Sequence, residues 1–176
     1  MRLRTLRLII RPFQLADATV ALAYLGDPAV MRFCEPPFDA ARTQEWVSRF
    51  SAEDAPVHAV TTHAGDLVGH VIFHELGTAD IYELGWVLRT DAQGQGYAAE
   101  VSRAVLDYGF VRMGLHKVAA ETVAANVPAR LLLERLGFRQ EGLLREHARL
   151  AGEWVDVVWY GLLADQHKPA IGLSTT

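Results

Sequence analysis

The chain has 176 residues, of which 51% are hydrophobic and 22% are charged, and its 17 Lys and Arg against 21 Asp and Glu give a formal net charge of -4. We expect one globular domain spanning residues 1–176. The single cysteine, Cys34, excludes a disulfide scaffold and a cysteine-based zinc site, and a cytoplasmic location fits best. The negative charge argues against nucleic-acid binding, and no stretch approaches the ~20 apolar residues of a membrane span.

The first third of the chain is predicted to hold a strand, two helices and a loop. Apolar and polar residues alternate over residues 6–14, which predicts a strand near a sheet edge. A helix is expected from Asp17 to a stop signal at 26–28, and a second over 43–49. Residues 31–38 are rich in aromatic residues and proline, which is typical of a loop that contacts a ligand and equally of a packed connector.

The middle of the chain reads as three strands followed by a long helix. Strands are expected over 57–62, 67–74 and 81–88, and the short turns between them predict an antiparallel meander. Apolar residues then recur at spacings of three and four over 97–113, which predicts an amphipathic helix that ends near Gly114.

The last third of the chain is predicted to add three strands and one helix. The strands are expected over 116–123, 138–148 and 154–163, and the helix over 128–136. The whole order of elements predicts a mixed sheet with helices on both faces.

A glycine-rich turn over residues 90–99 joins the third meander strand to the long helix. Glycines at 94 and 96 let the backbone approach a ligand closely. The first helical N–H groups have no partner inside the helix and lie at the positive end of its dipole. A pyrophosphate is the ligand that this turn favours.

The same turn also fits a dinucleotide-binding fingerprint. Gly94, Gly96 and Ala99 match G-x-G-x-x-G/A, and Glu121 stands where an acid that binds the ribose would lie. Against this alternative, an antiparallel meander precedes the turn, and too few residues follow Glu121 for further βα units.

Four motifs in order make the chain resemble the GNAT superfamily of N-acetyltransferases, in particular its RimJ/RimL-like branch. The Q/R-x-x-G-x-G/A loop resembles Gln93 to Ala98, and N-x-x-S/A followed by L-G-F resembles Asn126 to Ala129 and Leu136 to Phe138. The opening residues 3–12 and the closing Glu141-Gly142 with Trp154-Val155-Asp156 are similar as well.

The resemblance implies an α+β fold of GNAT type, with about seven mostly antiparallel strands and a splayed pair that forms a wedge for acetyl-CoA. Its pyrophosphate would rest on the amides of residues 94–99. The residues expected to contact acetyl-CoA are Trp86, Val87, Leu88, Gln93, Gly94, Gln95, Gly96, Tyr97, Ala98, Ala99 and Asn126. No metal is implied.

The resemblance also gives two catalytic candidates and leaves the general acid without a candidate. Glu83 stands where some superfamily members have a general base, and a carboxylate in an apolar wedge has a raised pKa. The N–H of Val87 matches the family's oxyanion donor. Leu133 and Ala129 replace the usual tyrosine and serine, so the acid that protonates the thiolate is not assigned.

Other titratable residues are weaker candidates for the chemistry. His70 and His74 lie in a predicted strand, where a histidine is more often structural than a base. Cys34 could carry an acyl group, but nothing adjacent to it in sequence activates the thiol.

The leading hypothesis is an N-acetyltransferase that works by direct attack of a primary amine in a ternary complex. The branch implies the N-terminal α-amine of a protein such as a ribosomal protein, and small amines such as polyamines or aminoglycosides are the alternative. A non-catalytic acyl-CoA-binding module and an NAD-dependent oxidoreductase remain as alternatives of other classes. The sequence leaves the acyl group and the oligomeric state open, a homodimer included.

Overall fold

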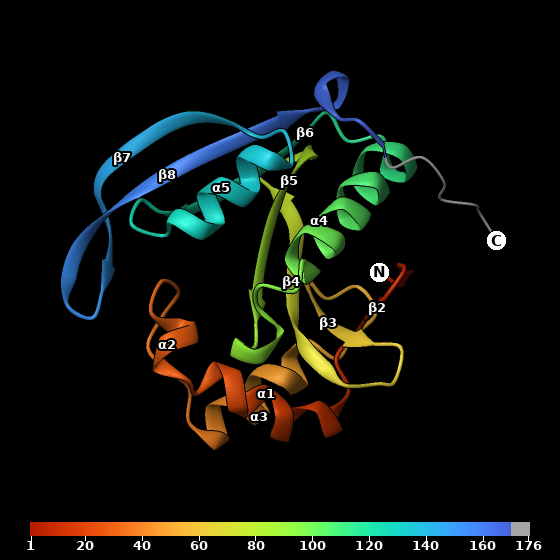
Figure 1. Ribbon diagram of the computed structural model, residues 1–176, viewed down its shortest axis with the longest axis vertical. Coiled ribbons are helices and arrows are strands. Elements are labelled where there is room, and N and C mark those ends of the chain that lie inside the picture. Colours follow the sequence, from red (N-terminus) through yellow and green to blue (C-terminus); the bar gives the residue numbers. More distant parts are fainter. Residues whose placement is uncertain (170–176) are drawn as a thin grey trace.

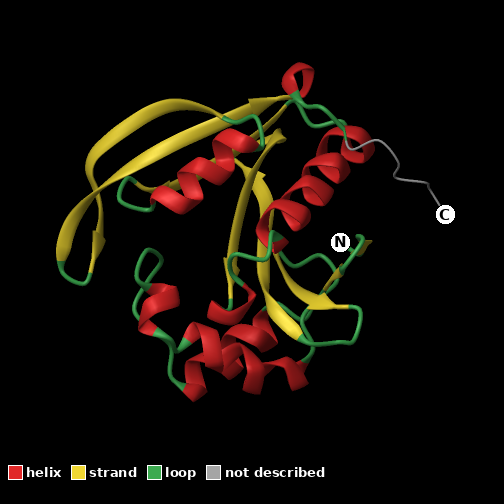
Figure 2. Cartoon of the chain, viewed as in Figure 1, coloured by secondary structure: helices red, strands yellow, loops and turns green. Residues whose placement is uncertain are grey.

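The computed structural model describes residues 1–169, which form one mixed sheet with helices on both faces (Figures 1 and 2). The strands are β1 (Leu3–Arg4), β2 (Leu8–Arg11), β3 (Val57–Thr62), β4 (Leu67–Leu76), β5 (Thr78–Leu88), β6 (Lys117–Val123), β7 (Arg139–Leu150) and β8 (Glu153–Leu163). The helices are α1 (Ala18–Leu25), α2 (Pro28–Met31), α3 (Ala40–Arg49), α4 (Tyr97–Asp107) and α5 (Val127–Arg135).

The sheet has the strand order β1-β2-β3-β4-β5-β6-β8-β7. All neighbours pair antiparallel except β5 and β6, which run parallel and share only three registered pairs. The meander β3-β4-β5 is therefore confirmed, and the parallel junction in the middle divides the sheet into two parts. Figure 1 shows β7 and β8 arching away from β4 and β5 beyond this junction.

Two apolar clusters hold helices against the sheet. On one face α4 and α5 pack on the strands through residues that include Val101, Val105, Leu133, Leu84, Val118 and Val158, all nearly inaccessible. On the other face α1 and α3 cover β3 and β4 through Ala21, Tyr24, Leu25, Val47, Ala59 and Leu67. Ala120 of β6 and Tyr160 of β8 belong to the first cluster, so α5 packs against this end of the sheet.

The helix boundaries follow local capping. Asp39 accepts a hydrogen bond from the Arg42 N–H at 2.8 Å, so α3 starts three residues earlier than its apolar pattern predicts. Asp27 caps α2 in the same way through the Ala29 N–H. The helix expected over 97–113 is α4 continued by a π-helical segment over Tyr108–Met113, and it ends at Gly114 as predicted.

The sheet has eight strands where about seven were expected. The additional strand is the two-residue β1, too short to show any alternation in sequence. β5 begins at Thr78 rather than at 81, because the turn at Gly77 lets it pair with the end of β4. Within residues 1–169, no helix is both long and apolar enough to cross a membrane.

Candidate active site

The site begins where β5 and β6 part. Their three registered pairs end with Glu83 opposite Ala119. β5 then continues to Leu88 along β4, while β6 continues to Val123 along β8, and no register joins them. A wedge therefore opens between two adjacent strands in the middle of the sheet.

The register decides which β5 backbone groups face this wedge. The Arg89 N–H donates to the Val68 carbonyl of β4 at 2.9 Å. Because hydrogen-bonding sides alternate along an antiparallel strand, Val87 also turns its backbone toward β4, and Trp86 and Leu88 turn theirs toward the wedge. The Val87 carbonyl agrees, since it lies 2.2 Å from the position that a Cβ on Gly69 of β4 would take.

This geometry corrects the expected role of Val87. Its N–H points to β4, so it is not placed to donate to an oxyanion in the wedge. The side chain of Val87 lies on the face of the sheet that α1 and α3 cover, where it packs against their apolar cluster. Trp86 and Leu88 remain candidates for backbone contact with a ligand in the wedge.

Glu83 lies at the apex of the wedge, half-buried, with its cross-strand neighbour His74. Glu83 Oε2 is 3.4 Å from His74 Nε2. Burial raises the pKa of Glu83 above its ordinary value, the negative charge of Glu121 raises it further, and His74 opposes both. Residue parity places Glu121, two residues beyond the last β6 pair, on the same face as Glu83.

The ring of His74 is fixed at its other nitrogen. The Nδ1 of His74 lies 2.9 Å from the Glu75 carbonyl oxygen, which can only accept, so Nδ1 carries a hydrogen. This contact orients the ring so that Nε2 faces the carboxylate of Glu83.

The phosphate loop, defined here as residues 93–96, has the geometry expected of an anion site. Gly94 and Gly96 adopt φ of 73° and 79°, in the region that favours glycine, and Gly96 is the N-cap of α4. Among the described residues 1–169, no side chain accepts a capping hydrogen bond from the first N–H groups of α4. The N–H groups of Gly96, Tyr97, Ala98 and Ala99 are thus left for an external acceptor.

The two glutamines of this loop brace it with their side chains. Gln93 Nε2 donates to the Leu88 carbonyl at 2.9 Å, and Gln95 Nε2 donates to the Asp91 carbonyl at 2.6 Å. Both amides therefore fix the path from β5 into α4.

Asn126 caps α5 at the other side of the wedge. Its Oδ1 accepts from the Ala129 N–H at 3.4 Å, and its Nδ2 donates to Thr122 Oγ1 at 3.2 Å. The long capping distance makes this a weak hydrogen bond, so Asn126 keeps capacity for a second acceptor or donor.

From the expected contact of Asn126 with acetyl-CoA and its observed cap on α5, we expect Asn126→Ala to weaken acetyl-CoA binding by about 10-fold and to destabilise the fold by about 1 kcal/mol. Isothermal calorimetry and thermal melting measure the two effects. An unchanged affinity with a lowered melting temperature would leave Asn126 with the capping role only.

The acid that protonates the thiolate is still not assigned. Leu133, at the position of the usual tyrosine, is 1% exposed and part of the core. The hydroxyl of Tyr160 is hydrogen-bonded to two residues of α5: it donates to Glu134 Oε1 at 3.3 Å and accepts from Arg130 Nε at 3.2 Å. The ring of Tyr97 lies beneath the Arg7 guanidinium, 4.6 Å from its carbon.

His70 and Cys34 lie outside the chemistry of the wedge. His70 is buried, its Nδ1 lies 3.0 Å from the Tyr24 hydroxyl, and burial lowers its pKa to about 3. It therefore stays neutral and structural beneath the sheet. Cys34 lies in the exposed segment after α2.

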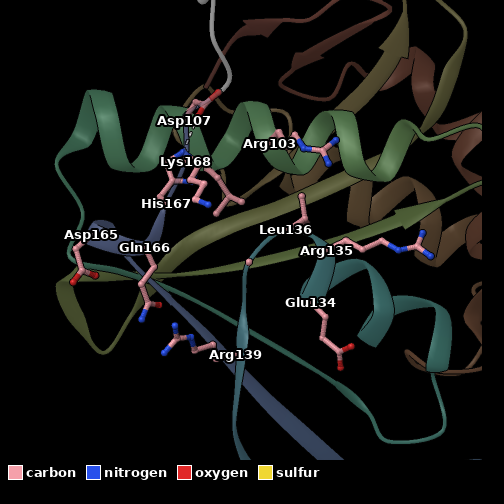
Figure 3. Close-up of a pocket in the computed structure, with 12 residues that line it drawn as sticks. Arg103, Asp107, Glu134, Arg135, Leu136, Arg139, Asp165, Gln166, His167 and Lys168 are labelled. Carbon is pink, nitrogen blue, oxygen red and sulfur yellow. Dashed lines mark hydrogen bonds and ion pairs between the residues drawn. The ribbon is translucent and has the colours of Figure 1, made fainter.

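A cavity of about 710 Å³ lies elsewhere, at the C-terminal ends of α4 and α5 (Figure 3). Arg103 and Arg135 reach it from the two helices, and Asp107 accepts from His167 Nε2 at 2.7 Å in its wall. The phosphate loop is at the N-terminal end of α4, so this cavity is separate from the wedge.

Sequence reasoning did not find that His74 and Glu121 lie near Glu83. It weighed His74 as a weak candidate for a base, more often a structural residue, and gave Glu121 only to the dinucleotide alternative. The signal for both is residue parity within paired strands, which is informative only when the partner strand and its register are known.

Comparison with known proteins identifies the family. Residues 7–139 match the model of the acetyltransferase (GNAT) domain. An uncharacterized N-acetyltransferase of Bacillus subtilis, YnaD, is 31% identical over 168 residues, which cover 94% of this chain and 99% of that protein.

Solved structures give the same result. A GNAT-family acetyltransferase from Bacillus anthracis superposes with a TM-score of 0.88 at 32% identity, covering 94% of this chain and 99% of that one. Spermidine N-acetyltransferase from Vibrio cholerae, solved with CoA and spermine, has a TM-score of 0.79 at 24% identity over 90% of this chain and 96% of that one, a likeness of fold. The chain belongs to the GNAT family of acetyltransferases.

Proposed function

We propose that this protein transfers the acetyl group of acetyl-CoA to a primary amine by direct attack in a ternary complex, and that the whole chain forms one domain for this purpose. The observation that carries the proposal is the meeting of two features at one place. The wedge between β5 and β6 opens beside the uncapped start of α4, so an extended thiol ester and its pyrophosphate can be held together.

The residues present fit acetyl-CoA. The N–H groups from Gly96 to Ala99 would hold the pyrophosphate, and a Cβ on Gly94 would meet nothing within 4 Å, which leaves open space beside the loop. Trp86 and Leu88 would donate backbone hydrogen bonds to the pantetheine amides and to the acyl oxygen. Acetyl-CoA itself supplies an activated acyl group on a good leaving group.

The chain's own groups would then handle protons and charge. Glu83, in its ionised form, accepts a proton from the ammonium of the acceptor, directly or through one water, and makes the amine nucleophilic. The Trp86 N–H, which takes the place expected for Val87, donates to the acyl oxygen as negative charge develops there. His74 holds the carboxylate of Glu83 in position.

Two kinds of amine fit the acceptor side of the wedge. Similarity to the RimJ/RimL-like branch supports the N-terminal α-amine of a protein such as a ribosomal protein. The pair Glu83 and Glu121 on one face supports a cationic small amine equally, because two carboxylates at the wedge attract ammonium groups. The known complex of the Vibrio cholerae protein with spermine makes polyamines the natural small amines to compare.

Thermal melting with acetyl-CoA, CoA and NADH is the first test. A ligand at 100 times its Kd stabilises the native state by about 2.7 kcal/mol. For a chain of this size we expect acetyl-CoA to raise Tm by about 5–10 °C.

Thiol release on a panel of amines follows, with peptides bearing free N-termini and polyamines as its two arms. A shift with NADH and none with acetyl-CoA would favour the oxidoreductase alternative. Binding of acetyl-CoA without thiol release on any amine would favour a non-catalytic acyl-CoA-binding module.

A further inference from the structure

The segment that leads into β2 is fastened to the first turn of α4 through Glu100. The carboxylate of Glu100 accepts from Thr5 Oγ1 at 2.6 Å, from the Arg7 N–H at 2.8 Å and from Arg7 Nε at 2.6 Å. Burial alone would raise the pKa of Glu100, but the hydrogen bonds from Thr5 and Arg7 outweigh it and hold the pKa below its ordinary value. Glu100 is therefore an ionised, three-bonded anchor on the helix.

The remainder of the Arg7 side chain lies along the phosphate loop. Its Nη1 donates to the Gln95 carbonyl at 2.9 Å, and its guanidinium carbon lies 4.6 Å from the centre of the Tyr97 ring. Its Nη2 is 3.5 Å from the position of a Cβ on Gly96. One guanidinium thus touches three successive residues at the start of α4.

This contact fixes a peptide plane of the proposed pyrophosphate site. In a trans peptide the N–H of Gly96 points opposite to the carbonyl of Gln95. Because Arg7 holds that carbonyl, the Gly96 N–H is directed away from Arg7. The flanking Gly94 and Gly96 restrain the backbone weakly, so Arg7 adds a restraint from outside the loop to those that Gln93 and Gln95 supply within it.

The same anchor keeps a competing anion away. Glu100 lies in the first turn of α4, where a free carboxylate is attracted by the unpaired N–H groups of the helix start. The carboxylate of Glu100 is bonded to Thr5 and Arg7 instead, and within residues 1–169 no side chain caps the start of α4. The charge of Arg7 is balanced by Glu100, so its effect on a bound phosphate comes from geometry rather than from added positive charge.

We propose that Arg7 is a positioning residue for acetyl-CoA, which aims the amides of the phosphate loop at the pyrophosphate by holding the Gln95 carbonyl and the Glu100 carboxylate. The proposal rests on the proposed function and goes beyond it, since it assigns a binding role to a residue 88 positions away in sequence from the carbonyl that it holds.

The test compares acetyl-CoA with S-acetylpantetheine, which carries the same thioester and lacks the pyrophosphate. In Arg7→Ala we expect the Kd and KM for acetyl-CoA to rise by about 10- to 100-fold, the cost of losing hydrogen bonds to charged groups. The kcat at saturation should stay within about twofold, and kcat/KM for S-acetylpantetheine should not change. Arg2→Ala is the matched control, an exposed arginine of the same segment that pairs with Glu53.

Arg7→Lys is the second variant, for use if Arg7→Ala fails to fold. A lysine keeps the charge but cannot hold the carbonyl and the carboxylate in one planar fork, so acetyl-CoA should still bind more weakly while S-acetylpantetheine is unaffected. Equal losses for both donors, or no loss for either, would overturn the inference. A wild-type protein that does not bind acetyl-CoA at all would overturn the proposed function, and the inference with it.

Discussion

Replacing Glu83 with glutamine should lower kcat by about 10²- to 10⁴-fold, the usual contribution of a general base, and leave the affinity for acetyl-CoA unchanged. Glutamine keeps the size of the side chain and its contact with His74 but cannot take a proton from the acceptor. Steady-state kinetics and calorimetry of the same preparation separate the two quantities. Glu75→Gln, an exposed carboxylate on the neighbouring strand, is the matched control, and a kcat equal to wild type in Glu83→Gln would rule out this base.

The pH profile gives an independent readout of the same group. Burial and Glu121 raise the pKa of Glu83, so kcat/KM should climb with pH through a midpoint above the ordinary value for a glutamate. In Glu121→Gln one of the two raising causes is removed, and the midpoint should move to lower pH. A midpoint that stays in place would show that another group governs the profile.

The stability of the fold should respond in the opposite sense to the activity. A carboxyl whose folded pKa is raised stabilises the native state fully at low pH, and this contribution is lost as pH rises through the folded pKa. At neutral pH, Glu83→Gln should therefore melt slightly above wild type. The base is held ionised at some cost to stability.

Replacing Gly69 with alanine should destabilise the fold by about 3 kcal/mol or more, a drop in Tm of about 6–12 °C for a chain of this size. Gly69 has a φ of +155° at a bulge between β3 and β4, and a Cβ there would lie 2.2 Å from the Val87 carbonyl oxygen and 2.8 Å from Leu88 Cα. Both contacts are backbone atoms of the wedge strand, so neither can move without shifting β5. Thermal melting measures the loss.

Gly65→Ala is the control for backbone strain without a clash. Gly65 has a φ of +96°, and a Cβ there would meet nothing within 4 Å. This variant should lose only about 1 kcal/mol. If the two variants melted at the same temperature, close packing at Gly69 would not be what requires glycine.

Much of the fold could be predicted because its signals are local. The meander from 57 to 88 is defined by alternation and short turns, and the limits of α5 lie within one residue of the expected ones. The early start of α3 depends on a cap that lies outside its apolar stripe. The two-residue β1 exists only through its pairing with β2, which no local pattern reveals.

In the site, too, the features with local sequence signals could be predicted and those that depend on long-range pairing could not. The glycine-rich turn of the phosphate loop was predicted from its glycines and the following helix, and Glu83 was a candidate only through the resemblance to the family. The direction of each N–H along β5 depends on which of its residues form hydrogen bonds with β4. Without the register of β4, the sequence cannot say whether the N–H of Val87 or that of Trp86 faces the wedge. The contacts of Arg7 with Gln95 and Glu100 join parts of the chain about ninety residues apart and have no sequence signature.

The three pairs between β5 and β6 also bear on how the molecule opens. Five strands lie on one side of this junction and three on the other, so the sheet is continuous in order but weakly tied at its centre. Acetyl-CoA seated in the wedge, as we propose, would contact β5 and Asn126 beyond β6, and so would join the two parts where the ladder is missing. Amide hydrogen exchange at Trp86, Leu88 and the end of β6 should therefore slow on binding, and the two parts of the sheet should unfold more nearly as one unit.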